Sequence, residues 1–229
     1  MALVLAGILV AGFGVRLALE APRPRNLIGM LLAPLGLCVA LVGVGRLLSP
    51  GFFGREARGH RALRIMPAGD LAMLDSPAGS KDRGGYRGPL WARLAGRGVD
   101  FVGATRGGPF AIDRDHEGFE GLTVDGLAAH LEADLPACAP DVILLYAGSV
   151  DLAAGAAPEV VVGRLSALID ATISRAPRAR LLVAALVGAA GIDPARVAAV
   201  NQALRQAVLD RAARGERVRF VDLAARVGK

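Results

Sequence analysis

The most constraining feature of this chain is the uninterrupted apolar run Val-Ile-Leu-Leu-Tyr-Ala over residues 142–147, which leads into Gly-Ser-Val-Asp at 148–151. A strand without apolar and polar alternation is typical of a parallel sheet that has helices on both faces. In open α/β sheets, ligands bind beyond the carboxyl ends of such strands. We therefore expect a buried central strand and place the candidate site at residues 148–151.

Strand and helix patterns alternate along the chain from residue 62 onward. Besides the central strand, we expect strands at 62–66, 100–103, 181–187 and 218–222, and helices at 86–95, 124–135, 158–176 and from Asp193 to about Arg214. Five alternating units favour a doubly wound parallel five-stranded sheet with the flavodoxin-like order 2-1-3-4-5. Strands one and three are then neighbours, so Asp70 should face residues 148–151. The segment 105–123 is expected to be a long functional loop.

The first 48 residues have a membrane-like composition. The segments 1–19 and 27–45 are each 19 residues of almost entirely uncharged sequence, and 19 helical residues span roughly 28 Å, the thickness of a bilayer core. These segments predict a hairpin of two transmembrane helices over 1–48, a linker over 49–61 and an α/β domain over 62–229. Arg23 and Arg25 in the connection favour an extracytoplasmic domain by the positive-inside rule, whereas several arginines after residue 45 oppose it.

Charge and cysteine content argue against several classes of partner. The formal net charge is +6, but the basic residues are scattered and form no aromatic-lined basic face, so nucleic-acid binding is not expected. The two cysteines, Cys38 and Cys138, have no metal-ligand spacing. No cofactor is expected, and no standard metal site is matched by the acidic group Asp113, Asp115, His116 and Glu117.

Six short motifs within the α/β domain together resemble the SGNH hydrolases, also called the GDSL esterase/lipase family. The motifs occupy residues 64–71, 85–87, 100–103, 115–121, 140–145 and 148–151. The resemblance implies a serine acyl hydrolase in which the serine of Gly-Asp-Ser attacks an ester. It also implies an oxyanion held by the serine amide, a glycine and an asparagine, and an Asp-x-x-His near the C-terminus that supplies the base.

The resemblance fails at the reacting groups. Leu71 occupies the serine position, and Val150 occupies the asparagine position. Loss of one oxyanion donor typically costs about two to three powers of ten in rate. No Asp-x-x-His follows the last expected strand. The family positions that do match are Asp70, Gly121, Gly148 and Asp151. We expect the two carboxylates among them to hydrogen-bond a turn and a following helix start.

Three hypotheses follow from this pattern. The first and favoured one is a membrane-anchored, catalytically inactive SGNH hydrolase-like domain that either binds a ligand or partner or has no remaining function; an acyl ester or a carbohydrate ester is the ligand considered. The second is an active esterase in which Ser76 or Ser149 acts as nucleophile and His116 acts as base. The third is a membrane-tethered interaction module. In it, a protein partner or the membrane surface covers the sheet face that the absence of a last helix leaves open.

Overall fold

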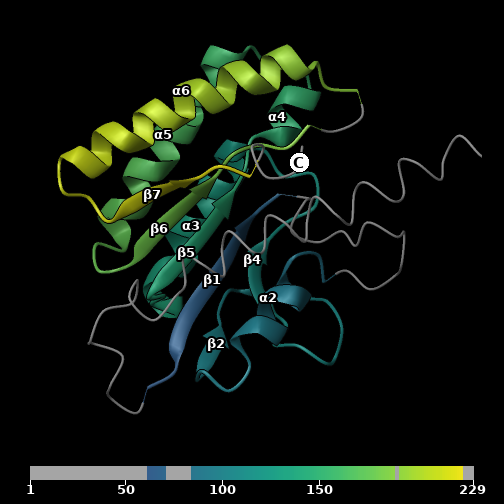
Figure 1. Cartoon of the computed structure of the whole chain (residues 1–229), viewed down its shortest axis with the longest axis vertical. Helices are drawn as coiled ribbons and strands as arrows, with labels where there is room; N and C mark the ends of the chain where they lie inside the picture. Colours follow the sequence, from purple (N-terminus) through teal and green to yellow (C-terminus); the bar gives the residue numbers. More distant parts are fainter. Residues whose placement is uncertain (1–60, 71–83, 189–190, 224–229) are drawn as a thin grey trace, which may run out of the picture.

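A seven-stranded sheet lies at the centre of the molecule (Figure 1). The computed structural model describes residues 61–70, 84–188 and 191–223. Its strand order is β3-β4-β1-β5-β6-β7, and β2 also pairs with β1. The strands are Leu63–Gly69 (β1), Val99–Phe101 (β2), Thr105–Arg106 (β3), Asp115–Gly118 (β4), Val142–Tyr146 (β5), Arg180–Ala184 (β6) and Val218–Val221 (β7).

Helices cover both faces of this sheet. They are Arg87–Leu94 (α2), Val124–Cys138 (α3), Ser149–Ala153 (α4), Pro158–Arg175 (α5) and Pro194–Ala213 (α6). Buried side chains of α3, α5 and α6 form one core cluster with one face of the sheet, and α2 forms a second cluster with the opposite face. The described chain is therefore a layered α/β structure, as the alternation of patterns predicted.

Burial on both faces of the central strand β5 explains why the run at 142–147 does not alternate between apolar and polar residues. Ile143 and Leu145 belong to the core beneath α3, α5 and α6, whereas Val142 and Leu144 belong to the core beneath α2. All five residues of β5 are buried. The prediction of a strand covered on both faces is confirmed.

The predicted strand order is confirmed for the five main strands, but the predicted number of strands is wrong. The order β2-β1-β5-β6-β7 corresponds to 2-1-3-4-5, and every pairing within it is parallel. The segment 105–123, expected to be a loop, contains β3 and β4. β4 pairs parallel with the end of β1, and β3 pairs antiparallel with β4. Both strands are short and polar, so they lack the apolar run by which a strand is recognised in a sequence.

Strand β1 continues through Pro67 to Gly69, although the strand expected from the sequence ended at residue 66, just before the proline. The carbonyl of Ile65 accepts a hydrogen bond from the segment after β2, and the carbonyl of Gly69 accepts one from the segment after β4. Pro67 lies between them and faces the same edge, at the point where pairing passes from β2 to β4. A strand tolerates a proline where no ladder hydrogen bond is required of it.

Helix α6 begins and ends where its sequence predicts. The carboxylate of Asp193 accepts a hydrogen bond from the amide of Ala195 at 2.8 Å, and Pro194 occupies the first helical position. Gly215 follows the end of the helix with a φ of +87°. This pairing of an acidic N-cap with a glycine just beyond the last turn fixes both helix boundaries.

The predicted membrane hairpin at 1–48 lies outside the described residues, as does nearly all of the predicted linker. Among the residues that the structure describes, no helix combines the length and apolar character needed to cross a bilayer.

Candidate active site at the carboxyl edge of the sheet

Three neighbouring strands, β4, β1 and β5, bring the matched family positions to one edge of the sheet. The parallel registers place Gly69 beside both Gly118 and Tyr146, so these strands end together. Asp70 directly follows β1, and Gly148 directly precedes α4. Gly121 lies in the turn after β4, with a φ of +72°. The carboxyl edge of parallel strands is the expected location of a ligand site.

Asp70 braces the start of α4. Its side chain is buried, and its Oδ2 accepts hydrogen bonds from both the amide (3.1 Å) and the hydroxyl (2.8 Å) of Ser149. The amide of Asp70 donates to the carbonyl of Tyr146 at 3.0 Å. The hydroxyl of Ser149 is therefore paired with a carboxylate.

Position 148 requires a glycine, both for its backbone conformation and for the space around it. Its φ is +108°, and a Cβ at this position would lie 3.1 Å from Cγ1 of Val161. Tyr146 is buried nearby and accepts a hydrogen bond from the amide of Val187 at 3.3 Å. Burial and the charge of Asp70 raise the pKa of Tyr146, so its phenol stays protonated at neutral pH.

Asp151 links α4 to two other helices. Its buried carboxylate accepts hydrogen bonds from the amide of Val124 at 2.9 Å and from Nη1 of Arg164 at 2.7 Å. The expectation that it would bind amides of the following helix is wrong, because Val124 begins the preceding helix, α3. The carboxylate satisfies an unpaired donor at the N-terminus of α3 and interacts favourably with the helix dipole there.

Val150 lies on the first turn of α4 and is half-buried. Its side chain has no hydrogen-bonding atom, so it cannot stabilise an oxyanion. Leu71 and Ser76, the nucleophile position and one proposed substitute, lie outside the described residues.

His116 is buried on the face of the sheet that α2 covers. Its Nδ1 accepts a hydrogen bond from the amide of Gly118 at 3.0 Å, and its Nε2 faces Gly107. Burial and the charge of Arg87 lower the pKa of His116 to about 4, so the imidazole is neutral at pH 7. No hydrogen bond joins His116 to Ser149 within the described part of the chain, so the structure does not pair the proposed base with this proposed nucleophile.

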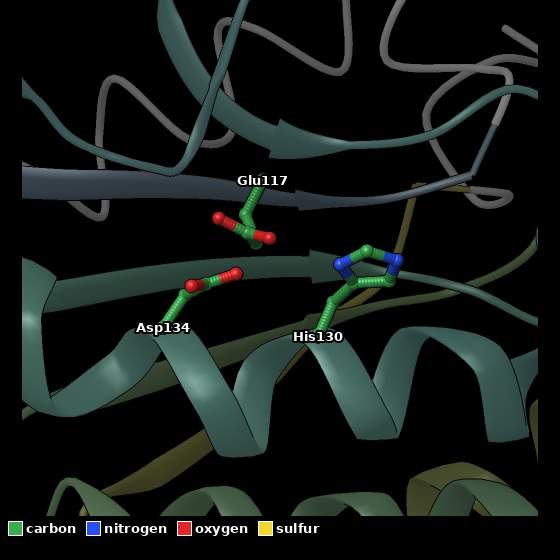
Figure 2. Close-up of side chains that lie close together, drawn as sticks. All are labelled: Glu117, His130 and Asp134. Carbon is green, nitrogen blue, oxygen red and sulfur yellow. The ribbon is translucent and has the colours of Figure 1, made fainter.

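The acidic group at 113–117 is not one site. Asp113 accepts a hydrogen bond from the amide of Phe101 at 2.9 Å, and Asp115 pairs with Arg106 at 2.8 Å. His116 and Glu117 are consecutive residues of β4, so their side chains point to opposite faces of the sheet. Figure 2 shows that Glu117 instead lies near His130 and Asp134 of α3. This group was not predicted from the sequence, where the spacing of four residues between His130 and Asp134 is the signal that points to it.

A groove of about 550 Å³ lies at the other edge of the sheet, where β6 and β7 begin. It is lined by apolar residues of the two strands, by Ala212 of α6 and by Arg180, Arg217 and Arg219. This lining contains no hydroxyl, carboxylate or imidazole side chain, so the groove offers neither a nucleophile nor a base for ester hydrolysis.

Solved structures similar to this chain include several esterases. A family 3 carbohydrate esterase of Clostridium thermocellum is 32% identical in sequence, with a TM-score of 0.63 over 72% of this chain and 80% of that chain. A mutant acetyl esterase with an acetate ion and a family 3 carbohydrate esterase of Talaromyces cellulolyticus are each 22% identical. Both have a TM-score of 0.62 over 72% of this chain and 82% of theirs. The latter two support the fold alone.

No curated protein matches the chain significantly in sequence. A family model described as the GDSL-like lipase/acylhydrolase family matches residues 75–229, which include all the described residues from β2 to β7. With its sheet order and the matched positions at the carboxyl edge, the chain belongs to the GDSL-like lipase/acylhydrolase family, the SGNH hydrolases.

Proposed function

We propose that this chain is a member of its family that binds an acyl ester of a carbohydrate without hydrolysing it. The observation that carries this proposal is the partner of the Ser149 hydroxyl at the carboxyl edge. That hydroxyl donates to the carboxylate of Asp70, whereas the buried imidazole of His116 uses its Nδ1 to accept from a backbone amide.

Acyl transfer requires a base that takes the proton of the attacking hydroxyl. A carboxylate that accepts the hydroxyl hydrogen bond is a much weaker base than an imidazole, so the pair of Asp70 and Ser149 favours a structural role. The family nucleophile position holds Leu71, which has no hydroxyl. Val150 supplies no donor for a tetrahedral oxyanion. These three features together support binding without turnover.

The proposed ligand class rests on the similarity to the Clostridium thermocellum carbohydrate esterase. A site that has the strand ends of an esterase but lacks the reacting groups retains, in this proposal, affinity for the substrate. Ground-state binding and transition-state stabilisation depend on different interactions, so one can be lost without the other.

The predicted hairpin at residues 1–48 would hold this domain at a bilayer surface, on the extracytoplasmic side according to the arginines between its two segments. The ligand would then be an extracytoplasmic carbohydrate ester. Protease accessibility of the domain in sealed cells tests the orientation, since cleavage only after lysis would contradict it.

Hydrolysis of a short-chain aryl ester by the purified protein tests the catalytic part of the proposal. We expect no turnover above the buffer rate from the natural sequence or from the Ser76→Ala, Ser149→Ala and His116→Ala variants. Turnover that collapses in one of the serine variants and in His116→Ala would establish an active esterase and overturn the proposal.

Calorimetric titration with an O-acetylated oligosaccharide tests the binding part. We expect heat of binding without release of acetate, and weaker binding of the same oligosaccharide after chemical deacetylation. Equal affinity for both oligosaccharides, or no binding of either, would contradict recognition of the ester.

A further inference from the structure

Three side chains with metal-binding groups meet between β4 and α3. Glu117 comes from β4, and His130 and Asp134 come from α3. Each offers one ligand atom, and these atoms all lie within 4.8 Å of one another. Figure 2 shows the carboxylate of Glu117 directed toward the helix, with the other two side chains extending from the helix toward it.

Glu117 is oriented by a backbone hydrogen bond. Its side chain is fully buried, and Oε2 accepts from the amide of Ala104 at 2.7 Å. Its other oxygen, Oε1, is also buried and accepts no hydrogen bond from an amide, hydroxyl or basic group of the described residues, and burial together with the neighbouring carboxyl of Asp134 raises the pKa of Glu117 to about 7. A buried carboxylate oxygen without such a donor is costly, and a bound cation would satisfy it. The Ala104 amide is the kind of outer contact that orients a metal ligand.

His130 and Asp134 are one helical turn apart and therefore lie on one face of α3. The ring of His130 stacks on Phe119, with 4.0 Å between ring centroids and an interplanar angle of 28°. This contact restricts the imidazole to the side of α3 that faces β4. Because His130 is exposed and Asp134 is half-buried, both side chains can adjust around a bound ion.

We propose that Glu117, His130 and Asp134 form a binding site for a zinc-type divalent cation, a function beyond ester recognition. One imidazole and two carboxylates are ligands that Zn²⁺ accepts, whereas Ca²⁺ and Mg²⁺ prefer sites made of oxygen ligands alone. The two carboxylates offset the charge of a divalent ion. Tetrahedral coordination needs ligand atoms roughly 3.4 Å apart, so His130 and Asp134 must move inward by no more than about 1.5 Å.

The bound ion would fasten the connection between β4 and α3. The segment between Glu117 and His130 includes the loop with Gly121 and the first turn of α3. The ion would therefore hold the turn that carries one family oxyanion position against the sheet. Its role is structural, and it does not depend on whether the domain binds or cleaves an ester.

Zinc titration of the metal-stripped, full-length chain tests this inference. We expect one zinc per chain by calorimetry and elemental analysis, with a higher melting temperature when zinc is bound. His130→Gln and Asp134→Asn should each weaken zinc binding at least tenfold, roughly the effect of losing even an outer-shell partner. Both residues are at least partly exposed, so these variants should keep the fold, which far-UV circular dichroism checks.

The matched control is Glu132→Gln, which removes an exposed carboxylate of the same helix that pairs with Arg175. It should bind zinc like the natural sequence. Three results would each overturn the proposal: no stoichiometric zinc binding, affinity unchanged in the double variant His130→Gln/Asp134→Asn, or tighter binding of Ca²⁺ or Mg²⁺ than of Zn²⁺.

Discussion

Asp70 and Ser149, which are 79 residues apart, are joined by two hydrogen bonds to a single carboxylate oxygen. Oδ2 of Asp70 lies 3.1 Å from the amide nitrogen and 2.8 Å from the hydroxyl oxygen of Ser149. The pair fixes the end of β1 to the start of α4. This serine and this carboxylate thus stabilise the fold at the carboxyl edge. Their contact holds the Ser149 hydroxyl in a hydrogen bond to a carboxylate, whereas an esterase needs its hydroxyl paired with a base such as an imidazole.

The two bonds predict different losses of stability for the two partners. Asp70→Ala removes both bonds and leaves the Ser149 amide unpaired, so it should lower the free energy of unfolding by about 2 to 3 kcal/mol. Ser149→Ala removes only the hydroxyl bond and should cost about 1 kcal/mol. Urea denaturation measures both values. Equal losses would show that the amide bond contributes nothing.

Arg164 offers a comparison of a buried and an exposed ion pair on one side chain. It bonds the fully buried carboxylate of Asp151 at 2.7 Å and the exposed carboxylate of Asp125 at 3.2 Å. Asp151→Ala also orphans the amide of Val124 and should cost about 3 kcal/mol. Asp125→Ala should cost less than about 1 kcal/mol. Chemical denaturation of the two variants tests this, and similar costs would mean that burial does not set the difference.

Substitution of glycine by alanine should have opposite effects on stability at two positions, Gly103 and Gly163. A Cβ at Gly103 would lie 2.1 to 2.6 Å from backbone atoms of His116 and Glu117, so Gly103→Ala must displace β4. We expect a loss of about 3 kcal/mol or an unfolded protein. Gly163 lies within α5, where an added Cβ would have no neighbour within 4 Å outside its own helix turn, and Gly163→Ala should stabilise the protein by about 0.5 to 1 kcal/mol. A thermal melt that ranks the variants otherwise would contradict the backbone contacts of β4.

The ion pair of Asp170 with Arg211 predicts that the stability of the protein depends on pH in the acid range. Two hydrogen bonds from the buried Arg211 lower the pKa of Asp170 below its ordinary value of 3.8. The folded state therefore holds the carboxylate ionised where the unfolded state is protonated. The stabilisation is complete above the unfolded pKa and is lost as the pH falls through the lower folded pKa.

Asp170→Asn should therefore destabilise the protein at pH 7 and differ progressively less from the natural sequence below about pH 4. The matched control is Asp210→Asn, because Asp210 is exposed on α6 and its carboxylate accepts a hydrogen bond from the neutral side chain of Gln206 at 2.7 Å. Its stability difference should be small at all pH values. A pH-independent effect of Asp170→Asn, measured by urea denaturation at several pH values, would show that its charge is not involved.

The sequence predicts the fold wherever a local signal determines it. The apolar run of β5 and the capping residues of α6 act through neighbours in the chain, so their elements are found almost to the residue. Strand β4 has only the polar segment Asp-His-Glu-Gly, and it forms because the edge of β1 beyond β2 is open to pairing. The continuation of β1 through Pro67 depends on the same change of partner.

The candidate site divides in the same way. The proximity of Asp70 to residues 148–151 follows from the strand order, which the sequence predicts. The partners of Asp151 and the group of Glu117, His130 and Asp134 depend on how α3 packs on the sheet, and spacing along the chain does not determine that packing. The sequence does contain the spacing of four residues between His130 and Asp134, although only the position of Glu117 gives that spacing significance.

Reaction of the full-length chain with a fluorophosphonate, followed by intact mass measurement, tests the central claim most directly. Such a reagent forms a stable adduct with a serine only where the hydroxyl is activated for nucleophilic attack. The hydrogen bond from Ser149 to Asp70 and the leucine at position 71 predict an unmodified chain after prolonged incubation. One adduct per chain on Ser149 or Ser76, absent from the corresponding alanine variant, would contradict the claim that the acyl-transfer groups are missing.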